Sequence, residues 1–195
     1  MLERASESTA ARPLYSADEI GAILRERGWL EGENTPEIEA WCAEAAALLG
    51  RQAALQAQSE SDAGAPPATS REVLVDLLAL VFHYDARAVL ATQEAHAVLA
   101  RAGARDVIRA LAHEVLDAPE IDSDHLREIV ERLKQQAGFA GRQIFHPLRL
   151  VLAGRVGEGE LDRVILLLDR AARLPFRAPV KGTRQRALEF CSALD

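Results

Sequence analysis

The chain has 195 residues, of which 49% are apolar and 27% are charged, as is ordinary for a folded protein of one domain or two small ones. No apolar stretch approaches the roughly 18–20 uncharged residues that a membrane helix needs. The first residues also lack the apolar core of a secretory signal, so we expect a cytoplasmic protein without a membrane span.

Charge is unevenly distributed along the chain, whose formal net charge is −7. Residues 140–195 hold ten basic and six acidic residues, whereas the other residues hold 13 basic and 24 acidic ones. A basic end on an acidic body indicates an anionic partner such as nucleic acid, and uneven surface charge without a partner is the alternative. Only Lys134 and Lys181 are lysines. The abundant arginine suits bidentate phosphate contacts, and it equally fits a GC-rich genome.

The first part of the chain predicts a helical hairpin after a disordered start. Residues 1–15 have no periodic pattern, and we expect them to be disordered. Ser16 with Glu19 has the spacing of a capping box, and Thr35-Pro36 suits the start of a second helix. The hairpin is predicted over residues 16–58, and small and polar residues over 59–69 predict a linker.

The rest of the chain, residues 70–195, is predicted to form a second helical domain. Its apolar residues recur with the period of a helix, and no alternating strand pattern occurs. The expected helix starts and ends are Ser70, Asp85, Gly103, Asp122 or Ser123, and Gly138. One helix is expected over about 104–117. The fold class is therefore predicted to be all-α, a helical bundle of about eight to ten helices.

No set of residues predicts catalysis or metal binding. The closest approach to a zinc-protease motif is His113-Glu114, which no second histidine follows. His83 and Asp85 could share a metal, but this spacing is common by chance. The glycines of 154–160 follow a helical run and lack a lysine, unlike a phosphate-binding loop. Cys42 and Cys191 share no motif, and we expect reduced thiols. We expect no metal, no cofactor and no enzymatic activity.

An ordered series of residues runs from the middle of the chain to its end. In order, it comprises Ile129, Leu133, Lys134, Gly138, Gly141, Pro147-Leu148-Arg149, Leu152-Ala153-Gly154, Leu161, Leu166 to Asp169, Arg186, Leu188, Ala193 and Leu194. With this series, residues 106–154 and their continuation resemble the C-terminal anticodon-binding region of bacterial glutamyl-tRNA synthetases. A looser likeness extends back to about residue 70. The resemblance implies an all-helical, stand-alone relative that lacks the catalytic domain.

The resemblance also implies roles for particular residues. Pro147 would start a buried helix, Gly154 would end it, and Arg149 would make a structural ion pair. In the family, the following turn presents a proline and a leucine beside anticodon bases. Here Gly159 replaces the proline, and a basic insertion follows over 170–182. The candidate RNA-binding residues are Arg155, Glu158, Gly159, Leu161, Arg173, Arg177, Lys181 and Arg184.

Two functions are compatible with these features. The first is binding of tRNA or another structured RNA, without catalysis, through the basic C-terminal part. The alternative is a protein-interaction module that has lost RNA binding and acts with a catalytic protein partner. Glu158 and Glu160 favour this alternative, because they place negative charge where RNA phosphates would pass.

Overall fold

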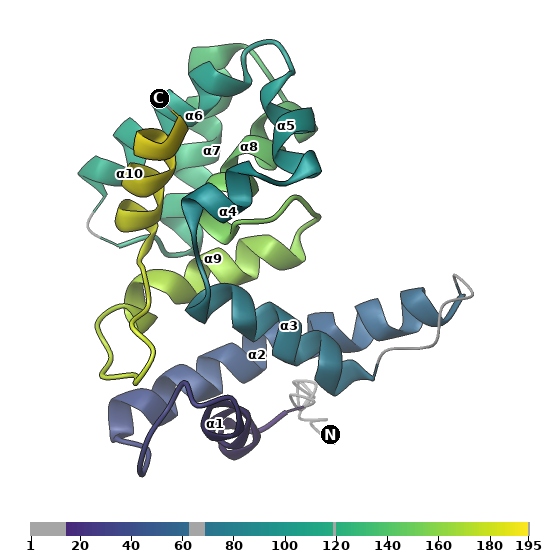
Figure 1. Cartoon of the computed structure of the whole chain (residues 1–195), viewed down its shortest axis with the longest axis vertical. Helices are drawn as coiled ribbons and strands as arrows, with labels where there is room; N and C mark the ends of the chain where they lie inside the picture. The colour runs from purple at the N-terminus through teal and green to yellow at the C-terminus, as the bar shows by residue number, and fades with distance from the viewer. Residues whose placement is uncertain (1–14, 63–68, 119, 195) are drawn as a thin grey trace, which may run out of the picture.

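The computed structural model describes residues 15–62, 69–118 and 120–194, and these residues form ten helices without a strand. The predicted all-α class is therefore confirmed. The helices are α1 (Ala17–Glu26), α2 (Pro36–Asp62), α3 (Ser70–Phe82), α4 (Ala86–Leu90), α5 (Gln93–Leu99), α6 (Ala104–Asp117), α7 (Ser123–Ala137), α8 (Arg142–Ala153), α9 (Glu160–Ala171) and α10 (Thr183–Leu194) (Figure 1). The stretch expected to be disordered, 1–15, lies outside the described residues except for Tyr15.

Most helix starts follow the local capping signals. Ser16 and Glu19 form the capping box of α1, and Asp85 and Asp122 accept backbone N–H bonds at the starts of α4 and α7. The predicted cap of α3, Ser70, was wrong by one residue, although the helix does begin at Ser70. Thr69 is the cap, because its hydroxyl accepts the N–H of Glu72 three residues on.

The helix predicted after Asp85 is interrupted in the structure. Helix α4 ends at Leu90, and α5 begins at Gln93, with only two residues between them. The side chain of Thr92 accepts the N–H of Ala95 and donates to the carbonyl of Val89. This threonine therefore closes one helix and caps the next, which splits the segment into two short helices.

Two apolar cores meet along α9, which lies across the middle of the molecule (Figure 1). The first core joins α1, α2 and α3 to one face of α9, including Val164 and Leu168. The second core joins helices α4 to α8 and α10 to Leu161 and Ile165 on another face of α9. The chain therefore passes from the first core to the second near residues 82–84, rather than in the segment 59–69 expected to be a linker. Helix α2 also continues to Asp62, through the first part of that segment.

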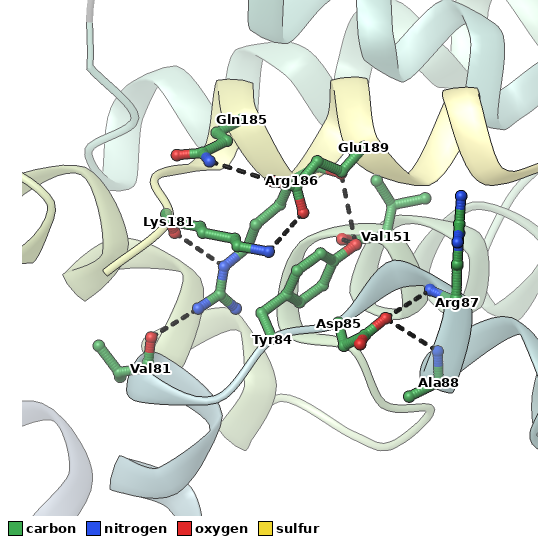
Figure 2. A network of polar contacts seen from close by, with 10 residues as sticks. All are labelled: Val81, Tyr84, Asp85, Arg87, Ala88, Val151, Lys181, Gln185, Arg186 and Glu189. Carbon is green, nitrogen blue, oxygen red and sulfur yellow. Dashed lines mark hydrogen bonds and ion pairs between the residues drawn. The ribbon is translucent and has the colours of Figure 1, made fainter. Parts of the chain in front are cut away.

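Arg186 of α10 is fully buried where the two cores meet (Figure 2). Its guanidinium donates to the backbone carbonyls of Lys181, Leu152, Leu80 and Val81 at 2.7–3.0 Å. The same group lies 4.6 Å from the centre of the Tyr84 ring. Burial lowers the pKa of Arg186 to about 10, so the side chain remains charged at neutral pH. One cation therefore ties α10 to the ends of α3 and α8.

Candidate nucleic-acid interface

Residues 154–159 connect α8 to α9, and we call this segment the link. Arg149 holds the link in place. Arg149 is buried and donates to both carboxylate oxygens of Asp162 at 2.7 and 2.8 Å. Its third contact is a bond of 2.7 Å to the carbonyl oxygen of Gly157, within the link. The ion pair expected for Arg149 is thus present, and it fixes the link against the first turn of α9.

Helix α8 ends where the sequence predicted but begins elsewhere. Gly154 ends the helix in the left-handed conformation, with φ of 74°, and its N–H donates to the carbonyl of Leu150. The predicted start at Pro147 was wrong, because α8 begins five residues earlier, at Arg142. Pro147 cannot donate to the carbonyl of Gln143 four residues back. Because Gln143 is exposed, water can hydrogen-bond this carbonyl instead.

The predicted RNA-binding residues of the link and of the first turn of α9 are not equally accessible. The side chain of Leu161 is 1% exposed and packs in the second core, so it presents no surface to RNA. Arg155 is exposed and has no ion-pair partner among the described residues. Glu158 lies 3.5 Å from Arg142, and Gly159 precedes the first residue of α9.

The other predicted residues lie beyond the opposite end of α9, which is roughly 18 Å long at 1.5 Å per residue. Three of these four basic residues have acidic neighbours, and Arg184 is exposed without an ion-pair partner among the described residues. The pairs are Arg173 with Glu120 at 2.7 Å, Arg177 with Glu31 at 3.9 Å, and Lys181 with Glu189 at 2.6 Å. The structure therefore separates the predicted set into two groups and partly neutralises the second.

Sequence reasoning missed a group of basic residues beside the link. Arg142 occupies the first position of α8, where a cation is unfavourable for the helix dipole unless an anion is near. Arg101, in the turn before α6, places its guanidinium 3.1 Å from Nδ1 of His146. Burial first, and then the charges of Arg101, Arg142 and Arg149, lower the pKa of His146. The ring is therefore neutral at pH 7 and accepts the bond from Arg101.

The link surface, defined as Arg142, His146, Arg155 and the exposed part of the link, is next to an open hollow. This hollow has a volume of about 530 Å³. It is lined by Phe82, His83, Tyr84, Asp85, Ala88, Val89, Thr92 and Gly154. Arg155 follows Gly154 and is therefore adjacent to this partly apolar recess, whereas Arg142 lies at the other end of α8. The guanidinium groups suit phosphates, and the recess suits a planar base.

Within the described ranges, no three acidic, histidine or cysteine side chains gather where they could hold a metal ion. In the same part of the chain, no helix has the length and apolar character required to cross a membrane. Cys42 and Cys191 form no disulfide. Burial raises the pKa of Cys42 to about 11, which keeps this thiol protonated at neutral pH.

The fold and the link surface define the class of this chain as an all-helical domain with exposed arginines. Comparison with known families makes this class specific, because residues 68–174, more than half of the chain, match the model of the anticodon binding domain. The chain belongs to this anticodon-binding-domain family. The similarity expected with synthetases is thereby confirmed.

The curated relatives are glutamate–tRNA ligases. The ligase of Carboxydothermus hydrogenoformans is 28% identical over 105 residues, which are 52% of this chain and 22% of the ligase. The ligase of Listeria welshimeri is 29% identical over 93 residues, or 48% of this chain and 19% of the ligase. The matched part therefore spans about a fifth of the length of these relatives. No solved structure matches the chain.

Proposed function

We propose that this chain binds tRNA, or a structured RNA like it, at the link surface and without catalysing a reaction. The observation that carries the proposal is the pair of exposed arginines, Arg142 and Arg155, beside the link of an anticodon-binding-domain fold. The related proteins are named as ligases that act on tRNA, which makes tRNA the natural ligand to test.

The chemistry of the link surface supports an RNA ligand. Arginine donates in a fixed fork that matches phosphate oxygens, and it stays charged at any physiological pH. The first turn of α8 contains no acidic residue, and its cap, Gly141, makes no side-chain bond. The positive end of the helix dipole therefore adds to the charge of Arg142. Glu158 offsets part of this charge, but the side chains of this pair are about three-quarters exposed, so the pairing is weak.

The proposal places the main RNA contact within the basic C-terminal part, but near its beginning. Arg142 and Arg155 belong to that part, whereas Arg173, Arg177 and Lys181 each have an acidic neighbour. An acidic partner must be displaced before such a cation can bind a phosphate, which reduces the gain. We therefore expect the segment 170–184 to contribute less to RNA binding than the link surface.

The test is a salt-dependent binding titration with total tRNA. Because two phosphate contacts are lost, R142A/R155A is expected to bind about tenfold more weakly than the wild type, and its salt slope should be lower by about 2. The control R27A/R127A removes the same charge from the end of α1 and from α7, and it should bind like the wild type. No binding of the wild type at ~50 mM salt would refute the proposal.

A second candidate function is binding of a protein partner through the outer face of α10. Leu188, an exposed large apolar residue, is 45% exposed there. It borders a hollow of about 450 Å³ between α4 and α10, which also contains Asp85, Arg87, Lys181 and Glu189. Mixed charge around an apolar residue is typical of the rim and anchor of a protein interface.

The variant L188E distinguishes the two candidates. If α10 binds a catalytic protein partner, burial of a carboxylate in the interface should weaken that complex at least tenfold, measured with the purified partner protein. Because Leu188 lies on α10 and outside the link surface, tRNA binding should be unchanged. A loss of tRNA affinity in L188E with unchanged folding would instead place RNA on α10.

A further inference from the structure

A row of arginines follows the outer face of α6, starting in the turn before it. Arg101, Arg105 and Arg109 are spaced four residues apart, and all three are exposed. Within a helix, this spacing advances about 6 Å along the axis and keeps side chains on one face. The opposite face of α6 is buried and apolar, and includes Val107, Ile108 and Leu111. The row is therefore turned outward.

The charges of this row are poorly neutralised. Arg105 has no ion-pair partner among the described residues, and Arg101 makes its polar contact with a histidine. Arg109 lies 3.7 Å from Asp106, and both side chains are at least two-thirds exposed, so this pair is weak. In contrast, Arg173 and Lys181 each lie 2.7 Å or less from a carboxylate. The positive charge of this exposed row is therefore largely available to an anionic ligand.

The row is continuous with the link surface. Arg101 contacts His146 of α8 at 3.1 Å, and Arg142 lies on the same helix, one turn before this histidine. Arg142 in turn lies 3.5 Å from Glu158 of the link. A single basic band therefore runs from the link, past the start of α8 and over the α5–α6 turn, onto α6.

We propose that Arg105 and Arg109, with Arg101 at their start, bind the phosphodiester backbone of the RNA held at the link surface. The inference rests on the proposed function, and it extends the site by two to three phosphates. Each step of the row, about 6 Å, is comparable to the separation of successive phosphates along a strand. Guanidinium groups along one helix face bind phosphates, which carry no sequence information, so we expect the row to add affinity independently of RNA sequence.

The experiment compares R105A/R109A with the control R27A/R127A, since both remove two exposed positive charges. Total tRNA is titrated into the full chain at several salt concentrations. R105A/R109A is expected to bind about tenfold more weakly than the control, with a salt slope lower by about 2. Because these side chains contribute little to packing, all variants should melt within a few degrees of the wild type.

The outcomes separate this inference from the proposed function. If the wild type binds tRNA but R105A/R109A has the affinity and salt slope of the control, the row is not an RNA contact, while the proposed function stands. If the wild type binds no tRNA, the proposed function fails, and the inference fails with it. A variant that binds tRNA normally but loses a purified acidic protein partner would overturn the inference in favour of a protein-binding row.

Discussion

The variant R186A is expected to lower the free energy of unfolding by about 3–5 kcal/mol. Domains of this size are typically stable by about 5–15 kcal/mol, so this loss would leave little of the fold at 37 °C. The reason is the number of groups that depend on one side chain. Arg186 is 0% exposed, and four backbone carbonyls accept its hydrogen bonds. Figure 2 shows the bonds to Lys181 and Val81.

The position of these carbonyls explains the size of the effect. Leu80 and Val81 lie in the last turn of α3, and Leu152 lies in the last turn of α8. The last carbonyls of a helix have no partner within it, and they carry the negative end of its dipole. The buried guanidinium supplies a hydrogen-bond donor and a positive charge to the C-terminal ends of α3 and α8 at once. Alanine would leave these carbonyls without their donor and would also leave a cavity against Tyr84.

A matched control lies two residues away. Arg184 is on the same helix and is exposed, so R184A should change the free energy of unfolding by less than about 0.5 kcal/mol. R186K keeps the charge but not the planar fork of donors, so its free energy of unfolding should lie between those of R186A and R184A. Urea unfolding followed by circular dichroism gives all three values. Equal stability of R186A and R184A would show that this network contributes nothing to the fold.

The sequence predicted local features well because their causes are local. The capping box of Ser16 and Glu19, the cap at Asp85 and the end at Gly154 each depend on residues within one turn. The errors have equally local explanations. Thr69 and Ser70 are both good caps, and a glutamate three residues on selects the first. Pro147 is favourable at a helix start, yet it is tolerated in α8 because the carbonyl it leaves free is exposed.

The candidate site was harder to predict because charge neutralisation depends on contacts between distant segments. Arg173 and Arg177 meet Glu120 and Glu31, which are far away in sequence. A count of charges over residues 140–195 therefore overstates the positive surface of that segment. Conversely, Arg105 lies in a part of the chain where acidic residues dominate the count. The fold is needed to reveal that its outer helix face is basic.

The second large effect is expected at Arg149, which links stability to the site. The variant R149M should lower the free energy of unfolding by about 2–4 kcal/mol, because it leaves the partly buried Asp162 without its cation. It also removes the donor to the carbonyl of Gly157, which holds the link. With the link released, Arg155 is no longer held in a fixed position relative to Arg142. We therefore expect tRNA affinity to fall about tenfold even where the variant is fully folded, because ordering the link on binding costs free energy.

The variant D162N separates the two roles of Arg149. Asparagine removes the charge from position 162, but Arg149 can still donate to Gly157, so the link should remain in place. D162N is expected to lose about 1–2 kcal/mol of stability and to keep nearly wild-type tRNA affinity. Binding is measured well below the melting temperature of each variant, so that unfolding does not contribute. If R149M binds tRNA as tightly as D162N, the position of the link does not determine RNA binding, and Arg149 serves only the packing of α8 against α9.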